Sequence, residues 1–207
     1  MSNICIFPKD VTTGFLKPVS DELRKQGYVV FDGDTREDGY AQSVINIIPN
    51  YECVVFLGHG SSTELYGSAL TSFLGGDNME VLRGKKMFLL ACNSGEFLDT
   101  YSLTSSIGFG DIPTGNQDVC GIIEREWDYF ESIPNDEDIK YFQSTIVRII
   151  MNSFVCGSMS NMDMLANKIK MFTNRERYDC LRKHKELHYR DILKMLYDFK
   201  ENMIYIR

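Results

Sequence analysis

The sequence lacks the features that nucleic-acid-binding and membrane-spanning proteins need. Its 22 lysines and arginines are outnumbered by 29 aspartates and glutamates, which gives a formal charge of −7, whereas nucleic-acid binding requires a basic surface. No apolar run approaches the roughly 18 residues of a membrane span. The N-terminal residues MSNICIFPKD show no basic flank before an apolar run, so no signal peptide is expected. We therefore expect neither nucleic acid nor membrane as a partner.

Paired cysteines and nucleotide-binding loops are also missing. No two of the six cysteines lie within four residues of each other, which excludes a CxxC motif and the spacing of a zinc knuckle. The chain contains no P-loop and no GxGxxG, and GHGSS lacks the spacing of a GxSxG nucleophile elbow. We expect free thiols in a cytoplasmic protein without a metal or cofactor. Cys5, Cys53 and Cys156 have apolar neighbours and are expected in the core.

The composition is that of an ordinary globular protein. The chain has 207 residues, of which 43% are hydrophobic and 25% charged, enough to bury a substantial core without disulfides. We interpret residues 1–207 as one domain in three parts: a sheet core over 1–112, an acidic loop over 113–138 and a helical part over 139–207.

Short apolar runs alternate with amphipathic stretches in the first part. Strands are expected at the following residues: 4–7, 28–31, 53–57, 86–90 and 106–112. Helices are expected between them, at residues 13–26, 40–48 and 78–84. Apolar strands separated by helices predict an α/β fold with a mainly parallel sheet covered on both faces.

The helical part shows three apolar stripes at helical spacing, which predict helices packed on the sheet. The stripes comprise Ile139, Phe142, Ile146, Ile149 and Ile150, then Met162, Leu165, Ile169 and Phe172, and then Ile192, Leu196 and Phe199. Residues 203–206 are expected to return to the sheet as a last strand. His184 and His188 in HKELH have the i, i+4 spacing of metal ligands, but Glu186 does not match HExxH, so a solvated helix face is expected.

Two of the predicted strands lead into chemically reactive residues. The strand at 53–57 runs into Gly58-His59-Gly60, and the strand at 86–90 runs into Ala91-Cys92. If these strands are parallel and adjacent, both side chains emerge at one edge of the sheet, where α/β proteins bind ligands. Each residue alone is more often structural; the two together predict a reactive pair.

A thiol beside an imidazole can act as a nucleophile. The unperturbed pKa of cysteine, about 8.5, leaves little thiolate at neutral pH, and an adjacent imidazole can take the thiol proton or protonate a leaving amine. The backbone amides of Gly60 and Cys92 are expected to form an oxyanion hole.

The two motifs VVFLGHGSS (54–62) and MFLLACNSG (87–95) resemble those of the caspase–gingipain–clostripain clan of cysteine peptidases. The version with Ala-Cys-Asn-Ser-Gly is most similar to the bacterial CHAT branch, which is related to separase. The pattern extends over about residues 3–112, and its specific part is confined to the two motifs.

The resemblance implies a caspase-like three-layer α/β/α sandwich and an endopeptidase with a Cys–His dyad. It implies His59 as general acid and base, Cys92 as nucleophile, a protein substrate, and a charged substrate residue before the cleaved bond. Because Leu90 stands where some relatives carry an acid two residues before the cysteine, Asp111, Asp32 and Asp34 are the expected substrate-binding residues.

The resemblance also implies a role in bacterial defence or cell death with a regulatory or sensor partner. Arg125 or Asp128 in the acidic loop would then be a processing site, the alternative being an ordinary exposed loop. The rival interpretation of the whole chain is an inactive caspase-like or flavodoxin-like scaffold that acts as a protein-interaction module.

Overall fold

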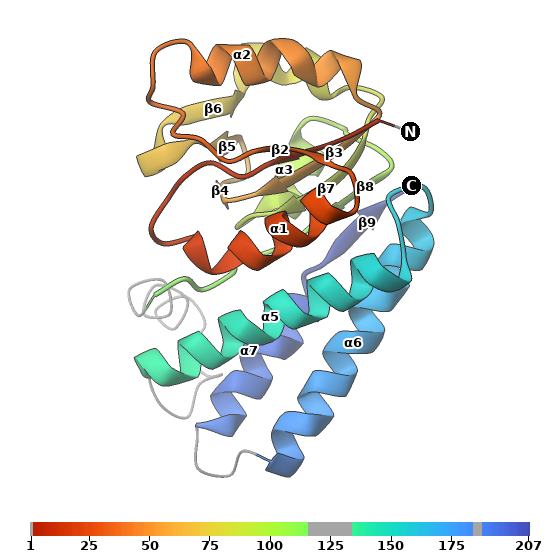
Figure 1. Ribbon diagram of the computed structural model, residues 1–207. Coiled ribbons are helices and arrows are strands. Elements are labelled where there is room, and N and C mark those ends of the chain that lie inside the picture. The colour runs from red at the N-terminus through yellow and green to blue at the C-terminus, as the bar shows by residue number, and fades with distance from the viewer. Residues whose placement is uncertain (1, 116–133, 184–187) are drawn as a thin grey trace.

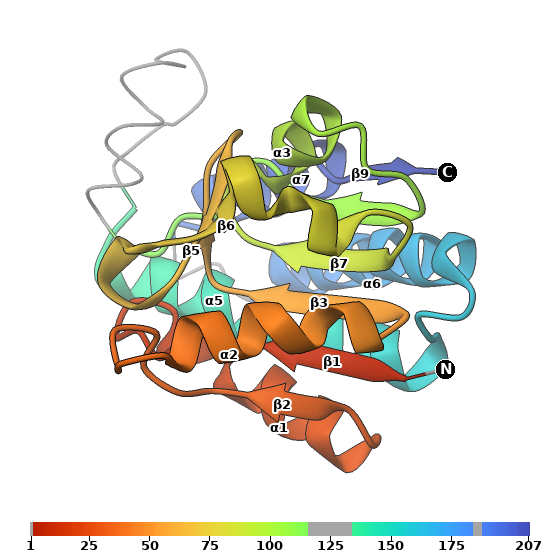
Figure 2. The same cartoon turned by 90° about the horizontal axis from the view of Figure 1, so that it is seen from above.

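The computed structural model describes residues 2–115, 134–183 and 188–207. Its centre is a six-stranded sheet with the order β2-β1-β3-β7-β8-β9, and all neighbours are parallel except β8 and β9 (Figure 2). The strands are β1 (Asn3–Ile6), β2 (Val29–Phe31), β3 (Cys53–Leu57), β7 (Lys86–Leu90), β8 (Ser106–Gly108) and β9 (Ile204–Ile206). The predicted α/β class with a mainly parallel sheet is confirmed.

Layers of helices cover both faces of this sheet (Figure 1). One face carries α1 (Lys17–Lys25), α5 (Asp136–Cys156), α6 (Met162–Lys183) and α7 (Tyr189–Glu201). The other carries α2 (Tyr40–Ile47) and α3 (Ser94–Thr100), with the 3₁₀ turns η2 (Ile48–Asn50) and η4 (Gly76–Leu82). Because side chains alternate along a strand, Val55 of β3 faces the first layer and Phe56 the second.

The C-terminal helices pack directly on the sheet. The Phe88 ring of β7 meets Phe154 of α5 with ring centroids 5.1 Å apart, and Phe109 stacks on Phe199 of α7 at 4.8 Å. The residues of the three predicted stripes are buried except Phe172, which is half-buried. The helical part therefore shares one apolar core with the sheet.

A buried carboxylate joins two of these helices. Asn135 and Asp138 form a capping box at the start of α5, so residues 136–138 of the predicted acidic loop are helical. The carboxylate of Asp138, fully buried, also lies 2.9 Å from Nδ1 of His188. His188 thus pairs with Asp138, while His184 lies outside the described residues.

Several expectations differ from the structure. The strand expected at 106–112 ends at Gly108, because the carbonyls of Phe109 and Gly110 turn to accept hydrogen bonds from Gly95 and Asn93. The helix expected at 13–26 begins as a 3₁₀ turn, η1 (Gly14–Leu16), and the one expected at 78–84 is the 3₁₀ turn η4. Cys156 is exposed at the end of α5, not in the core.

A second, antiparallel sheet was not expected from the sequence. It consists of β4 (His59–Gly60), β5 (Glu64–Tyr66) and β6 (Ser72–Gly75), and a further 3₁₀ turn, η3 (Ser68–Leu70), joins β5 to β6. This small sheet continues directly from β3 and contributes Leu65 and Leu74 to the core on the α2 face.

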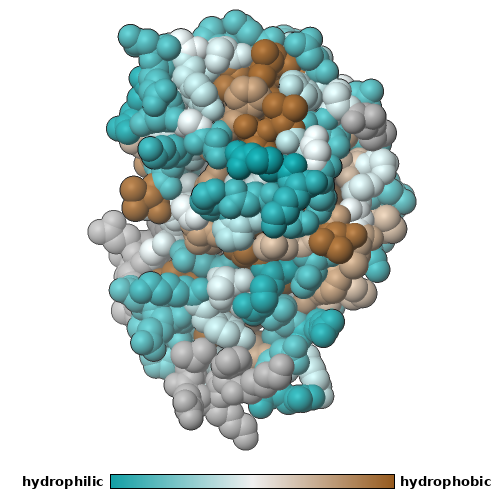
Figure 3. Space-filling model, viewed as in Figure 1, coloured by the Kyte–Doolittle hydropathy of each residue, from teal (hydrophilic) through white to brown (hydrophobic). Residues whose placement is uncertain are grey.

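Within the described ranges, no helix is both long enough and apolar enough to cross a membrane. The face shown in Figure 3 is mainly hydrophilic, with small and separate apolar patches.

We predict that Gly108→Ala destabilises the fold. A Cβ at Gly108 would lie 2.7 Å from backbone atoms of Ser94 and Gly95, which have no freedom to move aside. Urea unfolding should show a loss of about 2 kcal/mol or more. Gly14→Ala, where a Cβ meets nothing within 4 Å, is the control and should change stability by less than about 0.5 kcal/mol. Equal effects of the two substitutions would contradict the prediction.

Candidate functional site

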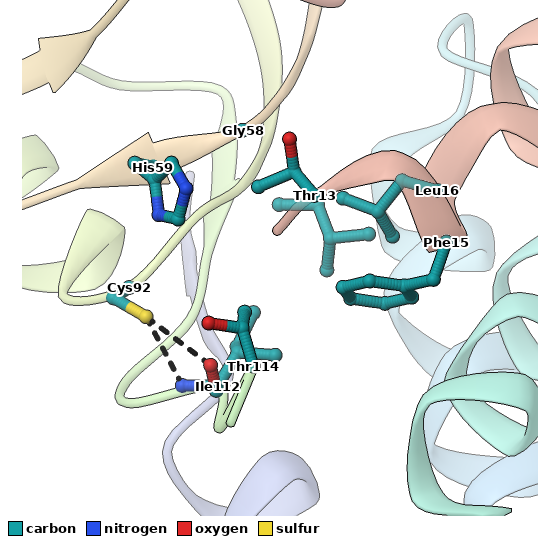
Figure 4. Close-up of a pocket in the computed structure, with 9 residues that line it drawn as sticks. Thr13, Phe15, Leu16, Gly58, His59, Cys92, Ile112 and Thr114 are labelled. Atoms are coloured by element: carbon teal, nitrogen blue, oxygen red, sulfur yellow. Dashed lines mark hydrogen bonds between the residues drawn. The ribbon is translucent and has the colours of Figure 1, made fainter. Parts of the chain in front are cut away.

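The two reactive residues follow paired positions of adjacent strands. β3 and β7 are parallel neighbours with Leu57 opposite Leu90, and the N–H of Gly58 extends their pairing by donating to the carbonyl of Leu90 at 3.1 Å. His59 and Cys92 each lie two residues beyond this last pair. The expected adjacency of the two strands is confirmed, and both side chains line one cavity at the carboxyl edge of the sheet (Figure 4).

A tight turn presents Cys92 at the end of β7. Asn93 adopts a left-handed conformation with φ of 52°, which asparagine tolerates better than most residues. The buried hydroxyl of Ser94 donates at 2.7–2.8 Å toward the carbonyls of Leu89 and Ala91 and accepts from the N–H of Phe109 at 2.9 Å. These bonds hold the strand end, the start of α3 and the chain after β8 together around Cys92.

Gly60 lies directly against this turn. A Cβ at Gly60 would be 2.9 Å from the carbonyl oxygen of Cys92 and 3.0 Å from the Cβ of Ala91. Only glycine allows this approach without displacing the backbone. The structure thus brings together the backbones of the two residues that were expected to form the oxyanion hole.

His59 is held by two residues that the sequence analysis did not select. Nε2 of His59 lies 2.7 Å from Oγ1 of Thr12 and 3.5 Å from Oδ1 of Asp10. Thr12 donates its hydroxyl proton to Oδ1 of Asp10 at 2.6 Å, so Oγ1 accepts the proton of Nε2. These contacts engage Nε2, and within the described part of the chain no hydrogen bond to Nδ1 is present.

Asp10 is itself well anchored. Its carboxylate also accepts from the N–H groups of Thr12 at 2.9 Å and Ala69 at 3.0 Å. Burial acts to raise the pKa of Asp10, but these hydrogen bonds and the neighbouring His59 outweigh it and lower the pKa overall. The position of Asp10 in the sequence could have pointed to this role, because Asp10 follows β1. β1 is the neighbour of β3, so the loop after β1 reaches the same edge of the sheet.

Both main-chain groups of Ile112 engage the thiol of Cys92. Sγ donates to the carbonyl oxygen of Ile112 at 3.4 Å and accepts from its N–H at 3.3 Å, as the dashed lines in Figure 4 show. The cavity beside the thiol has a volume of about 10 Å³, which is room for about one water molecule. Residues 110–114 therefore cover the approach to the sulfur.

The three expected substrate-binding acids have other partners and do not line this cavity. Asp111 accepts from Nδ2 of Asn93 at 3.0 Å, and Asp32 pairs with Arg24 at 2.8 Å. Asp34 pairs with Arg36 at 2.6 Å, and the hydrogen bonds from Arg36 lower the pKa of this aspartate. Arg125 and Asp128, the suggested processing sites, lie outside the described residues.

No protein-family model matches the chain, and no curated protein matches it significantly. The geometry of the site and the two sequence motifs are therefore the observations that bear on its function.

We predict that Asp10→Asn lowers stability in a pH-dependent way. The lowered pKa means that the Asp10 carboxylate stabilises the fold above the unfolded aspartate pKa of about 4, and that this contribution is lost as the pH falls through the folded pKa. The free energy of unfolding, measured with urea between about pH 3 and pH 7, should differ most between the wild type and Asp10→Asn near neutral pH. The two values should converge in acid. A difference in the free energy of unfolding that is the same at every pH would contradict a stabilising role of the ionised Asp10 carboxylate. Glu37→Gln, on the exposed surface, is the control.

We also predict that Ile112 slows reactions of the Cys92 thiol. Ile112→Gly makes residues 110–114 easier to displace and should raise the rate of Cys92 alkylation by iodoacetamide several-fold, measured by peptide mass spectrometry. The exposed thiol of Cys156 in the same molecule is the internal reference and should keep its rate. An unchanged Cys92 rate would mean that Ile112 does not limit access.

Proposed function

We propose that this protein is a cysteine endopeptidase of the caspase-like type, with Cys92 as nucleophile and His59 as general base and acid. The observation that carries the proposal is the convergence of one thiol and one oriented imidazole in a single cavity at the carboxyl edge of β3 and β7. The sequence motifs around both residues support the same assignment.

The proposed reaction begins with proton transfer from Sγ of Cys92 to Nδ1 of His59. The thiolate attacks the carbonyl carbon of the substrate, and the negative oxygen of the tetrahedral intermediate lies near the backbones of Gly60 and Cys92. His59 then gives its proton to the departing amine, and a thioester remains on Cys92. Water, activated by His59, hydrolyses the thioester and releases the free thiol.

Thr12 and Asp10 would support this proton cycle. Their contacts at Nε2 hold the ring and leave Nδ1 to receive the proton, and the carboxylate of Asp10 stabilises the imidazolium that forms. The chemistry needs a reduced thiol, which fits the reducing conditions of the cytoplasm.

The hydrogen bonds between Cys92 and Ile112 also favour a second candidate function. A thiol covered on its open side and a cavity with room for one water suit a non-catalytic, protein-interacting scaffold. Under the peptidase proposal the same contacts describe a covered state, and a substrate or a regulatory partner has to displace Ile112 before Sγ can attack.

We predict that Cys92→Ala and His59→Ala each abolish proteolysis. The purified protein is incubated with a peptide library made from a cell proteome, and new termini are identified by mass spectrometry. We expect cleavage by the wild-type chain and a loss of at least about 100-fold in either variant, with thermal unfolding used to verify that the variants fold.

Cys156→Ala is the matched control, because Cys156 is exposed and lies at the end of α5, outside the cavity. Cleavage that survives in Cys92→Ala would refute the assigned nucleophile. Absence of cleavage in both the wild type and the Ile112→Gly variant would favour the scaffold.

A further inference from the structure

The cavity beside the dyad has apolar walls from three separate segments. Phe15 and Leu16 come from the turn before α1, and Ile112 comes from the chain after β8 (Figure 4). Leu90 comes from the end of β7. Leu16, Leu90 and Ile112 are nearly inaccessible to solvent, with at most 5% of each exposed. These four side chains form the apolar part of the cavity next to the dyad.

Among the described residues that line the cavity, none carries a charge that could receive a charged substrate residue. His59 and Cys92 are the ionisable side chains in its lining, and both are assigned to the reaction. Asp32 and Asp34 are paired with Arg24 and Arg36, and Asp111 is bound by Asn93. A carboxylate or an ammonium group entering the cavity would lose its hydration without gaining a counter-charge, which is strongly unfavourable.

The cavity also has little capacity for hydrogen bonds. Oγ1 of Thr13 is buried and has no partner among the described residues, so it offers one hydroxyl to a substrate. One hydroxyl serves a backbone amide or a small polar group, but it does not balance a full charge. Thr114 supplies the second hydroxyl of the lining.

Ile112 indicates the size of the side chain that fits. Because its N–H and carbonyl oxygen both bond to Sγ of Cys92, a substrate that reaches the sulfur must displace it. When Ile112 moves away, its side chain vacates a space the size of an aliphatic side chain, next to the cavity of about 10 Å³. That space is bounded by Phe15, Leu16 and Leu90.

We propose that this cavity is the specificity pocket for the substrate residue on the amino side of the cleaved bond (P1), and that it selects an aliphatic side chain such as leucine, valine or methionine. The proposal rests on the proposed peptidase function and departs from the charged P1 residue that the family resemblance implied. Phe15 and Leu90 are the specificity-determining residues, and Ile112 occupies the pocket until substrate arrives.

A P1-scanning library tests the proposal. Fluorogenic tetrapeptides with randomised P2–P4 residues and a fixed P1 residue (Leu, Val, Met, Asp, Arg or Lys) are incubated with the full chain, with the Ile112→Gly variant and with Cys92→Ala. We expect kcat/KM for the aliphatic residues to exceed that for the charged residues by at least about tenfold, and Cys92→Ala to be inactive.

The outcomes separate the two proposals. Cys92-dependent cleavage that prefers Arg, Lys or Asp at P1 would overturn the pocket assignment and leave the peptidase function intact. Absence of Cys92-dependent cleavage for every P1 residue, in both the wild type and Ile112→Gly, would overturn both proposals.

A charge introduced into the pocket provides the second test. Phe15 is half-buried in η1, and Phe15→Asp places a carboxylate in the wall. The ratio of kcat/KM for P1 arginine to that for P1 leucine should rise at least about tenfold. Val11→Asp is the matched control, because Val11 is 97% exposed and does not line the pocket, and its ratio should not change.

Thr114→Asp is a second wall variant with the same expected shift, so the test does not depend on the folding of Phe15→Asp. Thermal unfolding verifies that each variant is folded before its P1 ratio is measured. Folded variants with an unchanged ratio would show that these residues do not contact the P1 side chain.

Discussion

The parallel pairing of β3 with β7 is the interaction on which the site depends. Its register places Leu57 opposite Leu90, so the residues that follow both strands emerge together at one edge of the sheet. A shift of one residue would turn every side chain of one strand to the opposite face and would move Leu90 from the α1 layer to the α2 layer. Sheet pairing, and not a local sequence motif, is what brings His59 and Cys92 into one cavity.

Small residues allow the segments that follow the paired strands to pack closely against one another. Gly60 allows β4 to pass against the carbonyl of Cys92, and Gly108 allows the start of α3 to pack on β8. Ser94 satisfies three main-chain groups at the point where these segments meet. Larger residues at the glycine positions would push these segments apart, so the close packing around the reactive turn depends on the absence of side chains there.

Much of the central sheet could be predicted from the sequence, because β3 and residues 87–90 of β7 are apolar runs, followed by Gly58 and by Ala91-Cys92. The small sheet of β4, β5 and β6 could not, because its short strands contain serine, glycine and glutamate and owe their shape to packing on the main sheet. The pairing of Asp10 with His59 also escaped prediction, since it joins residues 49 positions apart. Asp32, Asp34 and Asp111 were expected to bind substrate. Their partners, Arg24, Arg36 and Asn93, are revealed only by the fold.

The antiparallel edge strand β9 has a consequence for the covered thiol. β9 pairs Ile204 with Gly108, and the residues that cover Cys92 begin two positions after Gly108. β9 thus fixes the base of the segment that shields the sulfur, although the two are far apart in the sequence. A force or a binding partner that detaches β9 from β8 would loosen the cover, so this edge strand couples mechanical load to the reactive centre.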